Sequence, residues 1–173
     1  MNIRISIPSI IVIYSTLVIA SAYFIEYGLG YEPCELCLIQ RYPYYLIILS
    51  SITLSALKSE TIPITLPLFI FNRVYTGAYL AITVAALTGF LFATYHFGVE
   101  NNYWQNLSGC SDQLSGIELN ATNLLEDINQ IMPNCSDPLK FFGLSLSGYN
   151  VISNIFILGL IIFDIKNNKK NNN

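Results

Sequence analysis

The sequence predicts an all-α membrane protein, a four-helix transmembrane bundle with a long periplasmic loop that carries a short amphipathic helix. Hydrophobic residues make up 53% of the chain and charged residues only 11%, whereas a soluble domain carries about 25% charged residues. Four apolar segments approach the length of about 20 residues that a helix needs to cross a hydrocarbon core of about 30 Å. The length of 173 residues leaves room for one domain, so we assign residues 1–173 to a single membrane domain.

The predicted spans are residues 8–28, 38–57, 74–96 and 144–163. The first is longer than the apolar core of about 7–15 residues in a signal peptide, and no small-residue cleavage site follows it, so we expect a retained helix. The second reaches sufficient length only with the turn that starts at Leu38. The third should start after Arg73, because an ionised arginine deep in lipid costs roughly 2.5–3.5 kcal/mol. Pro63 and Pro67 place the apolar residues 62–71 in an interfacial loop.

Basic residues indicate the orientation of the bundle. Six of the eight fall on the side that holds both termini and the loop 58–73: Arg4, Lys58, Arg73, Lys166, Lys169 and Lys170. By the positive-inside rule this side is cytoplasmic. The loops 29–37 and 97–143 then face outward, which in a bacterium is the oxidising periplasm, and they hold all four cysteines. We therefore expect a multi-pass protein of the bacterial inner membrane. The net charge of −3 and the lack of a basic stripe argue against a nucleic-acid partner.

The long outer loop contains apolar residues at helix-like intervals. These are Ile117, Leu124, Leu125, Ile128 and Ile131. Acidic and amide side chains lie between them, as in an amphipathic helix on a membrane surface. Such a helix would keep the loop cysteines near the rest of the site, or it would pack on the bundle for stability alone.

A tight cysteine pair, Cys34 and Cys37, stands at the start of the second span, and four readings compete with redox chemistry. A thioredoxin site needs a soluble βαβ surround, which is missing here. A c-type haem needs His after the second cysteine, where this chain has Leu38. A closed zinc site needs four ligands, and the two other cysteines could complete the set with this pair. A purely structural disulfide is the fourth reading.

We favour redox chemistry and expect no metal, because Cys37 falls in the first turn of the second span. Unpaired N–H groups at a helix start favour a thiolate. Arg41 follows one turn later on the same face and would add a fixed positive charge. Taken alone, Arg41 would be read as snorkelling towards lipid head groups.

The second cysteine pair is loose: Cys110 and Cys135 lie in the only long polar stretch of the chain. A distant pair must be brought together by folding, so this pair needs mobility rather than a local turn. His96, the only histidine, is expected where the third span meets the outer surface. From the residues alone, it serves either the chemistry or packing.

At these residues the chain resembles the DsbB family of disulfide-forming membrane oxidoreductases. The matching segments, in chain order, are Pro-Cys-Glu-Leu-Cys-Leu-Ile-Gln-Arg at 33–41, Tyr-His-Phe-Gly-Val-Glu at 95–100 through Trp104 to Cys110, Pro-Asn-Cys at 133–135, Phe-Gly-Leu-Ser-Leu at 142–146 and Gly-Tyr-Asn at 148–150. One departure is Leu107, where close relatives often have a proline. The cytoplasmic loop with its two prolines is also long for the family.

The resemblance implies an electron relay from the periplasm into the membrane. A reduced DsbA-like thioredoxin-fold partner would attack Cys110 of a Cys110–Cys135 disulfide. The released Cys135 would attack Cys34 of a Cys34–Cys37 disulfide. Cys37 would leave as a thiolate and reduce a membrane quinone, ubiquinone or menaquinone. These four cysteines are the expected catalytic residues.

The resemblance also assigns the quinone-binding residues. Arg41 would stabilise both the Cys37 thiolate and the developing quinone anion. His96 would lie near the quinone as a hydrogen-bond or proton partner. Three rivals remain open: a vitamin K epoxide reductase-like enzyme, whose quinone-proximal pair comes after the loop pair, a paralogous oxidase dedicated to one partner, and a non-enzymatic membrane protein with static disulfides.

Overall fold

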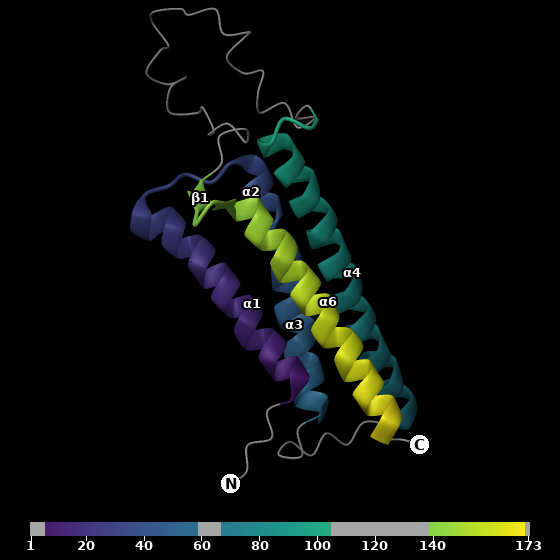
Figure 1. Ribbon diagram of the computed structural model, residues 1–173. Helices are drawn as coiled ribbons and strands as arrows, with labels where there is room; N and C mark the ends of the chain where they lie inside the picture. Colours follow the sequence, from purple (N-terminus) through teal and green to yellow (C-terminus); the bar gives the residue numbers. More distant parts are fainter. Residues whose placement is uncertain (1–5, 59–66, 105–138, 172–173) are drawn as a thin grey trace, which may run out of the picture.

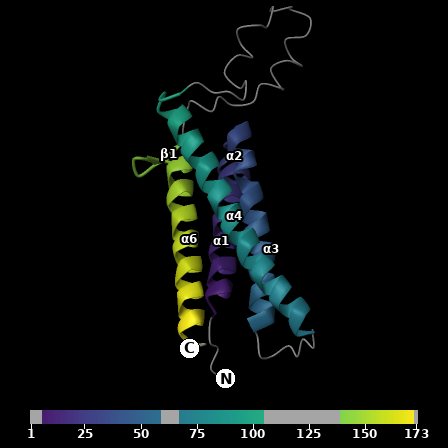
Figure 2. The same cartoon turned by 90° about the vertical axis from the view of Figure 1, so that its right-hand side faces the viewer.

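The computed structural model describes residues 6–58, 67–104 and 139–171, with side chains as far as residue 168. Four long helices lie side by side along a common direction (Figures 1 and 2). The elements in chain order are α1 (Ile7–Tyr23), the π-helical turn η1 (Phe24–Gly28), α2 (Glu35–Ile39), α3 (Arg41–Lys58), α4 (Leu68–Glu100), β1 (Lys140–Phe141), β2 (Leu144–Ser145) and α6 (Leu146–Asn171). The all-α fold class is confirmed.

Among the described residues, three helical segments are long and apolar enough to span a membrane: Ile7–Gly28, Leu68–Glu100 and Leu146–Asn168. The helix α3 is the fourth member of the bundle. Its 18 residues correspond to about 27 Å at 1.5 Å per residue, just under the hydrocarbon thickness of about 30 Å. The short α2 directly precedes it. The arrangement agrees with the predicted four-helix membrane bundle.

The third helix differs from the prediction at its start. The expected interfacial loop over residues 62–71 is wrong for its last part, because α4 begins at Leu68 rather than after Arg73. The carbonyl of Pro67 accepts the N–H groups of Ile70 and Phe71 at 2.9 and 3.0 Å, so the proline sits before the first turn. At 33 residues, α4 is about 50 Å long, so its ends extend beyond the hydrocarbon core and Arg73 needs no place within it.

The core lies where α4 packs between α3 and α6, while α1 packs chiefly on α3. Small residues of α4, including Ala78, Ala85 and Ala86, face this core and allow the helices to approach closely. Large apolar side chains such as Leu49 and Leu91 point outward, as expected for surfaces that meet lipid.

A buried polar cluster joins the last residue of α3 to side chains of α4 and α6. The ammonium of Lys58 donates to both carboxylate oxygens of Asp164, at 2.8 and 3.0 Å. The hydroxyl of Tyr79 donates to the same carboxylate. Because Asp164 is buried, these bonds stabilise a charge that would otherwise be costly in the bundle.

The opposite end of the bundle gathers α2, the last turn of α4 and a small hairpin. The strands β1 and β2 pair in antiparallel fashion, with Lys140 opposite Ser145 and Phe141 opposite Leu144. The turn between them places Phe142 and Gly143 at φ values of 50° and 84°, a region that glycine tolerates without strain. The hairpin leads directly into α6, which begins two residues later than the predicted span at 144 and continues beyond 163.

Candidate functional site

The tight cysteine pair is held by α2. Cys34 is the residue before the first turn, in an extended conformation, and Cys37 lies within the helix. Their sulfur atoms are 3.3 Å apart, a hydrogen-bonding distance rather than the about 2.05 Å of a disulfide. Cys34 is buried against Leu36 and Val99. The local turn therefore brings together the two sulfurs that the sequence places three positions apart.

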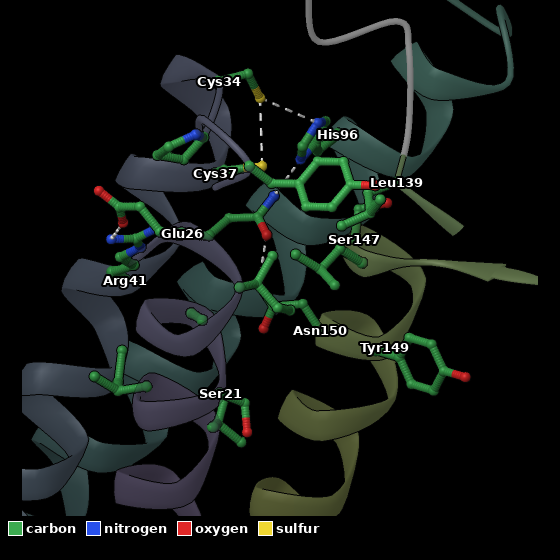
Figure 3. A pocket seen from close by; sticks show the side chains of 18 of the residues that line it. Ser21, Glu26, Cys34, Cys37, Arg41, His96, Leu139, Ser147, Tyr149 and Asn150 are labelled. Atoms are coloured by element: carbon green, nitrogen blue, oxygen red, sulfur yellow. Dashed lines mark hydrogen bonds and ion pairs between the residues drawn. The ribbon is translucent and has the colours of Figure 1, made fainter. Parts of the chain in front are cut away.

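His96 meets this pair from α4. Its Nε2 atom lies 3.7 Å from the Sγ atom of Cys34, and the side chain is 2% exposed. The prediction put this histidine at the outer end of the third span, and the structure places it one turn before the end of α4. Figure 3 shows the imidazole and both sulfur atoms converging at one end of a cavity.

A buried carboxylate, Glu100, faces the same ring nitrogen as Cys34. Its Oε1 atom is 3.4 Å from Nε2 of His96, and the hydroxyl of Ser147 donates to Oε2. Ser147 belongs to the first turn of α6, where the helix dipole favours a negative charge. No chemical role was predicted for Glu100. Its position four residues after His96 was the available signal, because such pairs share one helix face.

Two amide side chains form a series of hydrogen bonds that ends at the other ring nitrogen, Nδ1. Gln40 lies between α2 and α3, and its Nε2 atom is 2.9 Å from Nδ1 of His96. Asn150 of α6 donates through Nδ2 to Oε1 of Gln40 at 2.5 Å. Both residues fall in segments that carry the family resemblance, but neither was predicted as a site residue.

Arg41 pairs with an acid that the sequence analysis also missed. Its Nη1 atom is 2.6 Å from Oε2 of Glu26, and the two side chains are only 11% and 19% exposed. The guanidinium also lies over the ring of Tyr23, 4.9 Å from its centre. Glu26 belongs to η1, so the guanidinium predicted to act on Cys37 also forms an ion pair with the end of the N-terminal span.

The cysteine pair with His96 and the ion pair of Arg41 with Glu26 line one cavity of about 910 Å³. Its walls come from α1, η1, α2, α3, α4 and α6. The polar lining includes Glu26, Cys34, Cys37, Arg41, His96 and Asn150, and the apolar lining includes Val18, Ile19, Ile25, Leu139 and Leu146. A largely apolar cavity with a few polar groups is typical of a site for a small organic ligand.

The loop cysteines lie outside the described residues, as do the predicted amphipathic helix over residues 117–131 and residues 59–66 of the cytoplasmic loop 58–73. The structure therefore does not test the contact of Cys110 or Cys135 with Cys34. Trp104, the last described residue before their segment, donates to the carbonyl of Tyr95, the neighbour of His96, and Leu139 is the first described residue after it. Leu139 also lines the cavity.

Within the part of the chain that the structure describes, Cys34, Cys37 and His96 also form a group with metal-ligand character. One ligand atom from each lies within 4.8 Å of the others. Two thiols and one imidazole are a donor set that Zn²⁺ accepts when a fourth ligand completes a tetrahedron. Whether His96 can serve depends on which of its nitrogens carries the proton.

Two comparisons with known proteins give matches over most of the chain. The sequence model described as "Disulfide bond formation protein DsbB" matches residues 5–163. The chain is also similar to a protein of Rickettsia prowazekii (strain Madrid E) named "Uncharacterized protein RP370", with 29% identity over 167 residues, covering 92% of this chain and 88% of that protein. No solved structure gives a significant match.

Proposed function

This chain belongs to the DsbB family, membrane thiol oxidoreductases of disulfide bond formation, and from that premise we propose that it reoxidises a periplasmic DsbA-like thiol oxidase with membrane quinone as electron acceptor. One observation carries the proposal. The sulfur atoms of Cys34 and Cys37, 3.3 Å apart, line a largely apolar cavity together with Arg41 and His96. A ligand from the membrane that binds in such a cavity can accept electrons directly from the dithiol.

The relay begins with two thiol–disulfide exchanges. The thiolate of the reduced partner attacks Cys110 of the Cys110–Cys135 disulfide, and Cys135 leaves as a thiolate. Cys135 then attacks Cys34 of the Cys34–Cys37 disulfide, which releases Cys37 as a thiolate. Each exchange breaks one S–S bond and forms another, and the partner's second thiol then releases Cys110 from its mixed disulfide. Two electrons leave the sulfurs only when Cys34 and Cys37 close their disulfide again.

The cavity fits a quinone in size and chemistry. Its volume of about 910 Å³ lies within the range of about 300–1,000 Å³ usual for small-molecule sites. Apolar side chains such as Val18 and Ile25 suit a ring and its isoprenoid tail. A bound quinone, ubiquinone or menaquinone, supplies a two-electron, two-proton acceptor. Protons lost by the thiols can supply the two that quinol formation needs.

Arg41 and His96 are the proposed quinone-binding residues. The ion pair with Glu26 holds the guanidinium at the cavity wall, and a guanidinium carries further N–H donors in a fixed plane. Those donors can bind a ligand oxygen that becomes negative during reduction. His96 is buried at the same cavity.

The test uses the purified full chain, a reduced DsbA-like partner and a soluble quinone, with quinone absorbance followed over time. Quinone loss is expected to require both Cys37 and Cys110, so that Cys37→Ala and Cys110→Ala each abolish it. Thr53→Ala, on the exposed face of α3, serves as the matched control and should retain the wild-type rate. No quinone loss, with all four cysteines oxidised and unreactive, would instead establish static disulfides. Turnover with only one thioredoxin-fold partner would indicate a dedicated oxidase.

A further inference from the structure

A series of amide hydrogen bonds runs from α6 to the imidazole of His96, and it begins at a backbone carbonyl. Asn154 donates through Nδ2 to the main-chain oxygen of Asn150 at 2.8 Å. A carbonyl can only accept, so this bond fixes which end of the Asn154 amide is nitrogen. The same Nδ2 atom lies 3.0 Å from Oδ1 of Asn150, and the hydroxyl of Tyr44 also donates to that oxygen. The amide nitrogen of Asn150 must therefore point the other way.

That nitrogen faces Gln40. Asn150 Nδ2 donates to Oε1 of Gln40 at 2.5 Å, so the oxygen of Gln40 is taken and its amide nitrogen points at His96. The distance from Nε2 of Gln40 to Nδ1 of His96 is 2.9 Å. An amide NH₂ group only donates, so Nδ1 of His96 must accept and carries no proton.

The opposite edge of the ring leads to the same assignment. Nε2 of His96 lies 3.4 Å from Oε1 of Glu100 and 3.7 Å from Sγ of Cys34. An ionised carboxylate accepts hydrogen bonds and cannot donate them. The Ser147 hydroxyl supplies one of them to the other oxygen of Glu100. The nitrogen facing Glu100 and Cys34 is therefore the one that carries the proton.

We propose that Gln40 and Asn150 are positioning residues that hold His96 as the Nε2–H tautomer. Its one N–H group faces both Glu100 and Cys34 and donates a hydrogen bond to the Cys34 sulfur when that sulfur becomes a thiolate. Resting on the proposed function, this bond acts when the Cys110 thiolate attacks Cys135 of a Cys34–Cys135 disulfide. The Cys110–Cys135 bond forms, the Cys34–Cys135 bond breaks, and the electron pair stays on Cys34. His96 then stabilises the Cys34 thiolate as a donor, and it does not act as its base.

The same tautomer bears on metal binding. An imidazole binds a metal ion through the nitrogen that has no proton. In the proposed tautomer that nitrogen is Nδ1, which faces Gln40 rather than the sulfur atoms. The spacing of Cys34, Cys37 and His96 resembles a three-ligand site, but the amide series directs the lone pair of His96 away from it.

The test is direct because His96 is the only histidine of the chain. The full chain, labelled with ¹⁵N-histidine and purified without a histidine tag, should show one imidazole in a long-range ¹H–¹⁵N correlation spectrum. We expect an unprotonated Nδ1 and a protonated Nε2. Gln40→Glu and Asn150→Asp each replace a donor of the series by an acceptor of the same shape, so they should shift the population towards Nδ1–H. The matched control is Asn102→Asp, which adds the same charge in an exposed turn at the same end of the bundle.

A second readout follows the sulfur. In a chain with Cys37, Cys110 and Cys135 replaced by serine, alkylation of Cys34 at a fixed pH reports its thiolate. Loss of one hydrogen bond, worth about 0.5–1.5 kcal/mol, should slow this reaction roughly two- to tenfold in Gln40→Glu. A wild-type spectrum of the Nδ1–H tautomer, or a spectrum that neither substitution changes, overturns the proposal. Neither readout needs quinone or partner, so their failure is distinct from failure of the proposed oxidase activity.

Discussion

Replacing Gly98 by alanine should displace Trp104 from the end of α4. A methyl group at Gly98 would lie 2.0 Å from Cζ2 and 2.1 Å from Cε2 of the indole, far inside van der Waals contact. Trp104 donates through Nε1 to the carbonyl of Tyr95 at 2.8 Å. Its ring also stacks on that of Tyr95, with centroids 6.3 Å apart and planes 8° from parallel. The indole and the new methyl group cannot both keep these positions.

The energies of this change oppose one another. The lost hydrogen bond is worth about 0.5–1.5 kcal/mol, and the lost aromatic pair about 0.5–1.5 kcal/mol. Alanine in place of glycine inside a helix contributes about 1 kcal/mol in the other direction. The free energy of unfolding should therefore fall by only about 0–2 kcal/mol, while the indole leaves its position completely. Propensity alone would predict that Gly98→Ala stabilises the protein.

Fluorescence separates the two outcomes because Trp104 is the only tryptophan. In Gly98→Ala we expect emission at longer wavelength and stronger quenching by acrylamide. Gly77→Ala is the control in the same helix, because a methyl group there meets nothing within 4 Å. It should leave the emission unchanged and raise the unfolding free energy by about 1 kcal/mol. An emission spectrum of Gly98→Ala identical to wild type would refute the packing argument.

Two further predictions concern the ion pairs. Asp164→Asn should lower the free energy of unfolding by about 3–5 kcal/mol, because it leaves Lys58 without its carboxylate. Adding Lys58→Met should restore part of that loss in a thermal unfolding series, and no restoration would show that the charge is not the cause. Glu26→Gln should speed alkylation of Cys37 at fixed pH severalfold, because it removes a negative charge that opposes the Cys37 thiolate. Removing one charge near a protein surface changes the free energy of ionisation by about 1 kcal/mol. An unchanged rate would mean that Arg41 does not act on this sulfur.

The fold was largely predictable because lipid allows few solutions. A long apolar run must form a helix to satisfy its backbone, and the helices α1, α4 and α6 follow from that alone. The error at the start of α4 has a definite cause. The insertion cost of Arg73 does not end the helix, because a helix of about 50 Å continues past a hydrocarbon core of about 30 Å. The guanidinium of Arg73 lies over the ring of Phe69.

The site was predictable only where its parts are close in sequence. Cys34 and Cys37 lie within one turn, so their proximity follows from spacing. Glu26, Gln40 and Asn150 were missed because each acts through a partner on another element, and composition carries no signal for such a contact. Their roles appear only when the register between the helices is known.

The cavity beside Cys37 has a consequence for how affinity should be expressed. Its walls include Val18 and Ile19 of α1 and Ser153 of α6, both helices that can span a membrane. A ligand that reaches it from the bilayer moves in two dimensions and at a density set by the lipid, not by the water. Its dissociation constant is then expressed as a mole fraction in the lipid. Diluting the aqueous phase leaves the occupancy of the cavity unchanged. Adding lipid or detergent at a fixed amount of ligand lowers the occupancy of the site, because it lowers the mole fraction of the ligand.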